Sequence, residues 1–242
     1  MALPLYLAMT AAEIRKNTVL PPQMAYMACH FSPYGTGLTN PPEHFPAGSL
    51  LILNDRTPIH GHDPQEIFDH LEDLILRFHC SGLLLDFQRP GCKEAAALVT
   101  YITTQLPCPV AVSHCYENEH TGPVLLPPPP LDIPLSQYLG PWKSREIWLE
   151  VSQEGLMLTL TEEGCTAKPL PFAACSNGFF EDKLYCHYMT KISQSKAEFT
   201  LYRTREDLDA LLEEAESLGV TTAVGLWQEL NCQESNLPDP RL

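Results

Sequence analysis

A carboxylate and an amide stand two residues apart at the end of an apolar run. The run reads Ser-Gly-Leu-Leu-Leu-Asp-Phe-Gln over residues 81–88, so Asp86 and Gln88 directly follow a leucine-rich segment. Successive side chains of a β-strand point to opposite faces. We therefore expect Asp86 and Gln88 to share one face with Leu84, while the other face is entirely apolar. Such a pair can orient a polar group of a substrate, but an amide has no acidic proton to donate.

A strand with one apolar face and one face that turns polar at its end is typical of a parallel β/α barrel. The outer face of such a strand lies under helices, and its inner face leads to the mouth where barrel enzymes carry their active sites. Asp86 and Gln88 are therefore predicted to point into a functional site.

The first half of the chain has the matching pattern of elements. A helix is predicted to begin at Asp63, whose side chain can cap it, with Pro64 at the first helical position and apolar residues at helical spacing up to Phe78. A second helix is predicted over residues 93–105, before Pro107. Strands are predicted over residues 6–10, 24–31, 49–53, 82–88 and 109–113. Strand and helix alternating at this spacing indicate parallel β/α units.

The second half is less regular. A short strand over residues 124–126 runs into four consecutive prolines. Alternating patterns on either side of Glu154-Gly155 predict a hairpin of residues 147–153 and 156–161. Residues 184–192 and 198–203 look like another strand pair.

Helical patterning returns at Thr204, an N-cap candidate, and Gly219 is a plausible stop before a last strand over residues 222–229. We therefore expect an α/β fold, a single (β/α)₈ TIM-like barrel over residues 1–230 with an irregular second half. In that half, between about residues 123 and 203, hairpins are expected where helices would normally stand. A loosely held tail is expected over residues 231–242.

The composition restricts the partners and the compartment. The 242 residues include 15 Lys and Arg against 30 Asp and Glu, a net charge of −15. Nucleic acids and anionic membranes are bound through clustered basic residues, so neither is expected as a partner. The sequence has no basic leader and no apolar run of about 18 residues. Nine scattered cysteines without a Cys-x-x-Cys motif are typical of a reduced, cytoplasmic protein.

Further polar and aromatic residues fall near the predicted strand ends. Asp55 ends the third strand, Glu150 follows Trp148 in the middle region, and Glu229 is expected to share a strand face with Trp227. Because the carboxyl ends of parallel strands meet at one mouth, these residues are candidates for a common site. The predicted substrate-binding residues are Trp227, Asp55, His30, Tyr34, Tyr116 and Tyr188.

A metal site is the weaker interpretation of His60-Gly61-His62-Asp63. Two imidazoles two residues apart can converge on an ion, but Asp63 is better explained as a helix cap and no third ligand is evident. No metal and no cofactor is therefore expected. No glycine-rich phosphate loop is present in the sequence.

Two stretches resemble the family 18 glycoside hydrolases, the chitinase-like barrels. The fourth strand of that family carries DGxDxDxE, and the octet over residues 81–88 matches it at Gly82 and Asp86. The first two aspartates of the motif are absent, and Gln88 stands at the position of its final glutamate. Trp227 in the last predicted strand is similar to the tryptophan that floors the family's sugar site.

The resemblance implies an N-acetylated sugar as the small carbohydrate ligand. In the family, the acetamide carbonyl of the sugar attacks its own anomeric carbon, the final glutamate protonates the leaving oxygen, and the neighbouring aspartate orients the acetamide. Asp86 matches the orienting position. Gln88 cannot act as the acid, and the loss of a general acid costs on the order of 10²–10⁴ in rate.

The sequence leaves three functions open. The leading hypothesis is a carbohydrate-binding, glycoside hydrolase-like barrel with weak or lost hydrolysis, in which Asp86, Gln88 and Glu229 occupy the catalytic positions. An active glycosidase or other hydrolase would use Asp86 with Glu229, Glu150 or Asp55 as an acid/base couple. A non-catalytic scaffold would retain the barrel and have its mouth plugged by side chains. The oligomeric state is not specified by the sequence.

Overall fold

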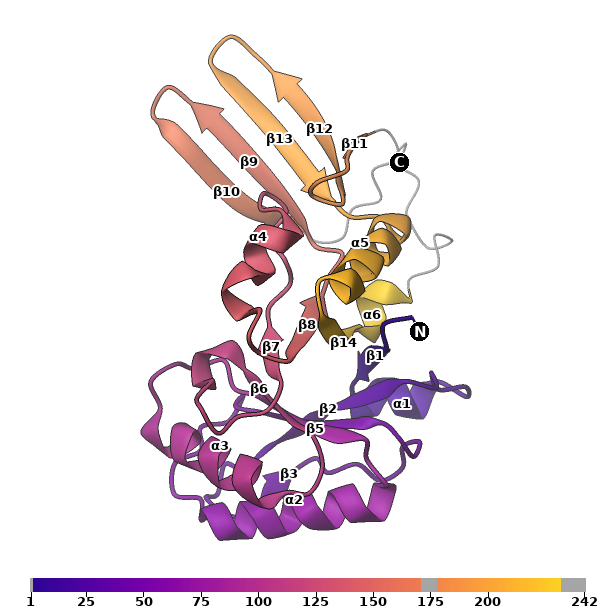
Figure 1. The fold of residues 1–242 in the computed structure, drawn as a ribbon, viewed down its shortest axis with the longest axis vertical. Coiled ribbons are helices and arrows are strands. Elements are labelled where there is room, and N and C mark those ends of the chain that lie inside the picture. The colour runs from indigo at the N-terminus through magenta and orange to yellow at the C-terminus, as the bar shows by residue number, and fades with distance from the viewer. Residues whose placement is uncertain (1, 171–177, 232–242) are drawn as a thin grey trace.

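The computed structural model describes residues 2–170 and 178–231. Eight parallel strands form a closed barrel, because the first strand pairs with both the last strand and the second. In the order of pairing, the barrel strands are β1 (Leu5–Met9), β14 (Val220–Leu226), β8 (Ile147–Val151), β7 (Val124–Leu126), β6 (Val110–Ser113), β5 (Gly82–Asp86), β4 (Leu50–Asn54) and β2 (Met24–Phe31). The predicted TIM-like barrel is confirmed (Figure 1).

Two helices cover the outer face of β5 and its neighbours. Helix α2 (Pro64–Phe78) begins where the Asp63 side chain accepts a hydrogen bond from the backbone of Gln65, as the capping pattern predicts. Helix α3 (Lys93–Gln105) has the predicted bounds. Their buried apolar residues share one cluster with Leu83, Leu85 and Phe87.

The inner face of β5 has the predicted alternation. Leu84 belongs to a separate cluster that fills the barrel interior, together with Ile52 of β4, Trp148 of β8 and Val224 of β14. The next inward position along β5 is Asp86. Because the apolar layer ends at Leu84, the polar end of the strand lies directly above a sealed core.

The middle of the chain differs from the prediction. Residues 147–151 form barrel strand β8, parallel to β7 and β14, and not one arm of a hairpin. The alternation at Trp148 and Glu150 arises because this strand faces both the barrel interior and the outer layer. The real hairpin joins β9 (Gly155–Thr161) to β10 (Gly164–Leu170).

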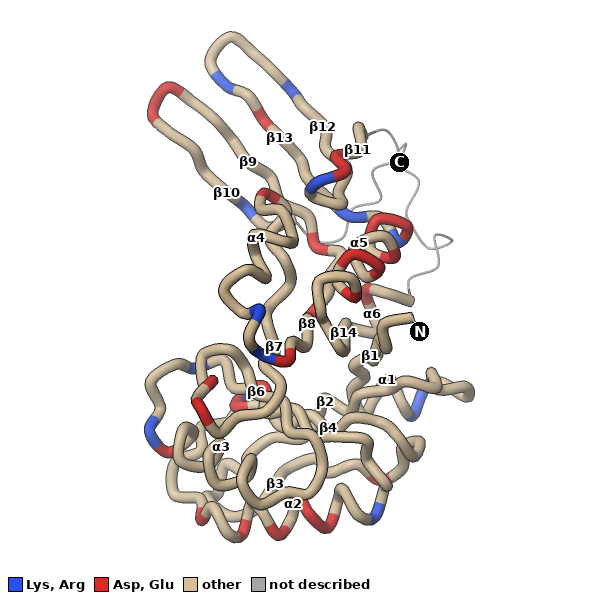
Figure 2. The backbone as a smooth tube through the Cα atoms, in the orientation of Figure 1, with Lys and Arg blue, Asp and Glu red and all other residues tan. Residues whose placement is uncertain are grey.

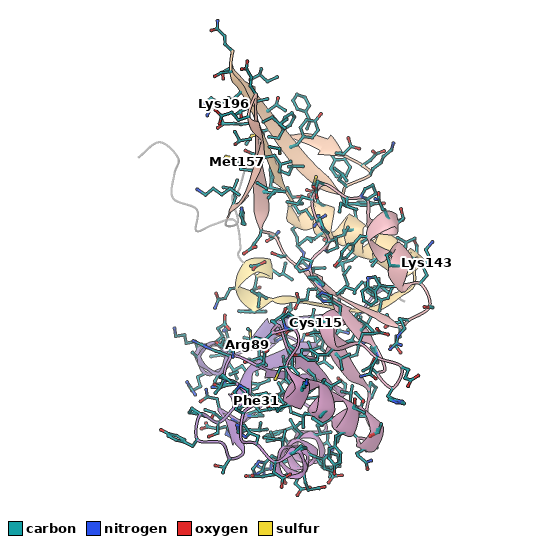
Figure 3. The ribbon with its side chains drawn as sticks, turned by 90° about the vertical axis from the view of Figure 1, so that its left-hand side faces the viewer. Phe31, Arg89, Cys115, Lys143, Met157 and Lys196 are labelled. Carbon is teal, nitrogen blue, oxygen red and sulfur yellow. The ribbon has the colours of Figure 1, made fainter. Side chains whose placement is uncertain are left out.

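A second, antiparallel sheet is inserted in the chain between β8 and helix α5 (Arg205–Ser217). Its order is β10, β9, β13 (Lys196–Tyr202), β12 (Cys186–Ile192) and β11 (Phe179–Glu181), so the predicted pairing of the strands near residues 184–192 and 198–203 is confirmed. The sheet extends away from the barrel (Figure 1), and Met157 and Lys196 lie on it far from the barrel body (Figure 3). The sequence predicts hairpins in place of barrel helices, but the sheet precedes helix α5 and does not replace it.

The remaining elements connect the barrel strands to one another. Thr204 and Asp207 form a capping box at the start of α5, and Gly219 follows that helix with a φ of 94°, as a stop residue does. The two-residue strand β3 pairs with β2, and helices and short helical turns connect the other strands. They are α1 (Ala11–Lys16), β3 (Leu38–Thr39), η1 (His114–Tyr116), α4 (Leu135–Leu139), η2 (Gly140–Trp142), α5 (Arg205–Ser217) and α6 (Trp227–Leu230).

The last strand also corrects the prediction. β14 ends at Leu226, and Trp227 begins the short helix α6. Trp227 and Glu229 therefore do not share a strand face. The tail from residue 232 lies outside the described residues, so its looseness and the domain boundary stay predictions.

A buried arginine fastens the second sheet to the barrel. Arg203, at the end of β13, is 3% exposed. Its guanidinium donates to the carbonyl oxygens of Pro129 at 2.8 Å, Tyr185 at 3.2 Å and Leu184 at 3.3 Å. Burial lowers the pKa of Arg203 to about 10. These bonds fix the proline-rich segment after β7, whose Pro128 reaches the barrel mouth.

Two further observations concern the cysteines and the length of the apolar helices. The cysteines of the described residues are free thiols. Within residues 2–170 and 178–231, no helix is long and apolar enough to cross a membrane.

Candidate functional site

A cavity of about 800 Å³ opens at the carboxyl ends of the barrel strands. Its floor is the top of the interior core, formed by Ala8, Ile52, Leu84 and Val224. Its walls come from β1, β2, β4, β5, β8, β14 and the loops that follow them. The titratable side chains of the lining are Arg15, His30, Asp55, Arg56, Asp86, Glu150, Glu154 and Glu229.

Asp86 and Gln88 meet in this cavity, as the shared strand face predicts. The Gln88 side-chain amide donates a hydrogen bond to Oδ1 of Asp86, and the Ser113 hydroxyl lies 3.4 Å from the same oxygen. Burial raises the pKa of Asp86, and the charge of Asp55 adds to this effect, while the two hydrogen bonds oppose it. Asp86 is therefore a half-buried carboxyl whose second oxygen accepts no hydrogen bond from a described residue.

Asp55 positions the segment that carries Gln88. Its Oδ1 accepts from the backbone N–H of Gln88 at 3.1 Å, and its Oδ2 accepts from the backbone N–H of Arg89 at 3.0 Å. The Cys115 thiol lies 3.0 Å from the carbonyl oxygen of Phe87, in the residue just before Gln88; Figure 3 labels Cys115 and Arg89. Both oxygens of Asp55 therefore accept backbone hydrogen bonds from the loop that carries Gln88 and Arg89.

Glu150 is the most perturbed carboxyl of the site. It lies on β8 in register with Val224 and two residues beyond the core residue Trp148. Burial and the charge of Asp86 raise the pKa of Glu150 to about 7. Its side chain forms no hydrogen bond and no ion pair with any residue that the structure describes. Its charge in turn contributes to the raised pKa of Tyr138, after burial, to about 12.

Glu229 reaches the cavity from helix α6. Its Oε2 accepts from the Ser152 hydroxyl at 2.7 Å and from the backbone N–H of Gln153 at 3.1 Å. These bonds connect α6 to the end of β8. The sequence places Glu229 at the mouth correctly although the strand expected to carry it ends three residues earlier.

The other predicted residues divide into two groups. His30 lines the cavity, with its Nδ1 3.0 Å from the carbonyl oxygen of Ala28. Trp227 does not line it and packs on the outer core cluster, and Tyr34 is 89% exposed.

Tyr116 and Tyr188 lie outside the cavity as well. Tyr116 is buried against the ring of Phe87, with its hydroxyl bonded to the carbonyl oxygen of Arg89. Tyr188 contacts Phe179 on the antiparallel sheet. Nearness to a predicted strand end is therefore a poor guide unless the face of the strand is also known.

Several lining residues escape the sequence reasoning. Asn54 ends β4 and its amide donates to the carbonyl oxygens of Met27 at 3.0 Å and Cys29 at 3.1 Å, which fixes a bulged stretch of β2. Ser152 lines the cavity two residues after Glu150, while Ser113, the last residue of β6, is not part of the lining and contacts it through Asp86. The period of two along each barrel strand is the signal that would have found the two serines.

Comparisons with known proteins place this geometry among known folds. No protein-family model matches the chain, and no curated protein matches it. The solved Bacillus cereus spore cortex-lytic enzyme SleL is similar with a TM-score of 0.64 at 11% identity, over 99% of this chain and 72% of that chain.

Two plant proteins have the same fold. The chitinase-like agglutinin from Robinia pseudoacacia gives a TM-score of 0.60 at 11% identity, over 91% of this chain and 93% of that chain. A class V chitinase mutant from Nicotiana tobaccum, in complex with NAG4, gives 0.59 at 9% identity over 93% of each chain. The chain therefore has the fold of the chitinase-like barrels, and at these identities the likeness shows the fold alone.

Proposed function

We propose that the chain is a carbohydrate-binding, glycoside hydrolase-like barrel whose cavity takes an N-acetylated sugar and whose hydrolysis is weak or lost. The observation that carries the proposal is the bond between Asp86 and Gln88 at the cavity. A carboxylate suited to orient an acetamide is in place, and the neighbouring acid position holds an amide. The fold neighbours include both a chitinase in complex with NAG4 and a chitinase-like agglutinin, which supports a carbohydrate ligand.

The chemistry follows from the hydrogen bonds. Oδ1 of Asp86 is occupied by Gln88 and Ser113, and Oδ2 is left to accept the N–H of an acetamide. The acetamide carbonyl is then aimed at the anomeric carbon of its own sugar. The glycosidic bond breaks only if its leaving oxygen receives a proton, and Gln88 has none to give. Binding is retained while turnover stalls.

The cavity itself argues against a pure scaffold. A scaffold predicts a mouth filled by side chains, whereas a volume of about 800 Å³ is within the range of small-molecule sites. Its apolar floor and polar rim also suit a sugar, which presents apolar ring faces and polar edges.

A second candidate is a hydrolase that uses Asp86 with Glu150. Of the three alternative carboxylates, Asp55 and Glu229 are both occupied by backbone N–H groups, while Glu150 has no such partner. Its pKa of about 7 leaves a large protonated fraction near neutral pH, which a general acid requires. Glu150 projects from β8, whereas Gln88 lies in the loop that follows β5.

Thermal unfolding with oligosaccharides separates these functions. The N-acetylglucosamine tetramer and the plain glucose tetramer cellotetraose are added to the wild type, Asp86→Asn and Gln88→Glu. A ligand at about 100 times its Kd adds about 2.7 kcal/mol of stability. We expect stabilisation by the acetylated tetramer only, its loss in Asp86→Asn, and hydrolysis that increases in Gln88→Glu.

Each alternative outcome has a definite meaning. No binding of either tetramer together with no hydrolysis by Gln88→Glu refutes the proposal. Hydrolysis by the wild type with a bell-shaped pH profile that is abolished in Glu150→Gln supports the second candidate.

A further inference from the structure

The cavity carries an excess of negative charge that its own cations do not neutralise. Five carboxyl groups line it, against two guanidinium groups. The guanidinium groups belong to Arg15 and Arg56, which are both exposed, whereas Asp86 and Glu150 are half-buried. No ion pair joins Asp86 or Glu150 to a cationic side chain of the described residues.

Hydrogen bonds from the protein stabilise only some of these carboxyl groups. Asp55 and Glu229 accept backbone N–H groups and so stabilise the loops that carry them. Asp86 accepts from two neutral groups, which leaves one oxygen free. Glu150 accepts from no described residue. The lining thus presents two unpaired acceptors of like charge to whatever occupies the cavity.

We propose that the sugar unit facing Glu150 carries a free, protonated amino group, so that the cavity selects a partly deacetylated amino-sugar chain over its fully acetylated counterpart. This inference rests on the proposed carbohydrate function and narrows its ligand. An acetamide on one unit still faces Asp86 and Gln88, and an ammonium group on another unit faces Glu150.

The physical reason is the difference between a hydroxyl and an ammonium donor. Either group can donate a hydrogen bond to Glu150, but only the cation also offsets the repulsion between Glu150 and Asp86. Hydrogen bonds between opposite charges are about twice as strong as neutral ones. The acetyl group of a fully acetylated chain removes the amine's positive charge and hence this contribution.

Proton release gives the inference a second readout. The raised pKa of Glu150 leaves much of this carboxyl protonated near neutral pH, and an ammonium ligand displaces that proton to solvent. The affinity falls at low pH, where Glu150 stays protonated, and at high pH, where the amine is neutral. The other titratable groups around the cavity are Arg15, His30, Asp55, Arg56, Asp86, Tyr138, Glu154 and Glu229.

Calorimetric titration of the full chain with matched tetramers tests the inference. The probes are the N-acetylglucosamine tetramer, the glucosamine tetramer and a tetramer with two units of each. We expect the mixed tetramer to bind about tenfold or more tightly than the acetylated one. The advantage decreases with added salt. Titrations near pH 6, where the ligand amine and Glu150 both hold their protons before binding, in two buffers of different ionisation enthalpy should show proton release for the amine-bearing probes alone.

Two variants assign the effect to its residue. Glu150→Gln keeps the size of the side chain and should abolish the preference and the proton release. Glu162→Gln is the matched control, because it also removes one negative charge but lies in the exposed acidic turn between β9 and β10 (Figure 2), and should retain both. Melting curves establish that both variants are folded.

The outcomes separate this inference from the function on which it rests. Equal or tighter binding of the acetylated tetramer by the wild type overturns the inference and leaves the proposed function standing. A preference that persists in Glu150→Gln overturns the assignment to that residue. No binding of any tetramer overturns both.

Discussion

Glu150→Gln should make the protein more stable at alkaline pH. The folded-state pKa of Glu150 is about 7, against an ordinary value of 4.5. Between these two values the unfolded chain has lost the proton while the folded chain still holds it. Stability therefore falls as the pH rises through this window, and the loss is complete above the folded-state pKa.

The expected loss of unfolding free energy follows from the size of the pKa shift of Glu150. At about 1.4 kcal/mol for each pH unit, a pKa raised from 4.5 to about 7 corresponds to an upper value of about 3 kcal/mol. Water enters the open cavity and screens part of the repulsion from Asp86, so we expect about 1–3 kcal/mol. Glutamine has nearly the same volume and no charge, so the variant removes this penalty without creating a void.

Urea unfolding near pH 5 and near pH 8 measures the effect. Relative to Glu150→Gln, the wild type should lose about 1–3 kcal/mol of unfolding free energy between the two conditions. Glu162→Gln controls for the change in net charge and should follow the wild type. If the wild type and Glu150→Gln have the same pH dependence, Glu150 is an ordinary solvated carboxyl, and the electrostatic argument for the amine-binding position fails with it.

Three further substitutions test individual parts of the structure. Asp55→Ala removes both acceptors for the backbone N–H groups of Gln88 and Arg89, so it should lower the free energy of unfolding in urea by about 1–2 kcal/mol and weaken ligand binding. Asp55→Asn retains one acceptor and should lose about half as much stability. Equal effects of the two variants would contradict the two-bond arrangement. Trp227→Leu should lower the melting temperature and leave oligosaccharide affinity unchanged, because the ring packs on the outer cluster; a loss of affinity at equal folding would return Trp227 to the sugar site. Arg203→Met should cost about 2–4 kcal/mol in chemical denaturation, since it strands carbonyl groups between the barrel and the second sheet, and a neutral effect would show that water replaces these bonds.

The elements that the sequence predicts well are those with strong local signals. The start of α2 depends on Asp63 and Pro64, which act within one turn, and the alternation in β5 depends on residues 82–88 alone. Both signals survive in the folded chain because the tertiary contacts reinforce them. The barrel follows from several such units in succession, since parallel strands joined by helices have few ways to close.

The errors arise where a pattern has two structural causes. Alternation around Trp148 and Glu150 fits a two-sided barrel strand as well as a hairpin arm, and only the pairing of β8 with β7 and β14 decides between them. No glycine or proline follows Leu226 to end the predicted strand, yet the chain turns into α6 at Trp227. In neither case does the local sequence contain the deciding contact.

The candidate site shows the same division. Sequence reasoning places Asp86 and Gln88 at the cavity because strand ends meet at a barrel mouth, and it places Glu229 there although this residue comes from α6. It cannot rank Glu150 above Asp55, because the ranking depends on which carboxyl groups the folded backbone uses as hydrogen-bond acceptors. The perturbation of Glu150 comes from burial and from Asp86, which lies 64 positions away in the chain.

Gln88→Glu is informative because the site is organised around the amide. Gln88 now uses its side chain to donate to Asp86 and its backbone N–H to donate to Asp55. A glutamate at this position keeps a hydrogen bond to Asp86 only if one of the two carboxyl groups holds a proton, since two carboxylates repel each other. The same repulsion, with Asp55 and Glu150 nearby, would raise the pKa of the introduced carboxyl and so give it the proton that a general acid needs. The variant is assayed for hydrolysis of an N-acetylated tetramer across a pH series. Activity that declines at higher pH, as this proton is lost, would show that one amide separates a binding site from a catalytic one. A folded, sugar-binding variant without turnover would show that Gln88 is not at the position of the acid.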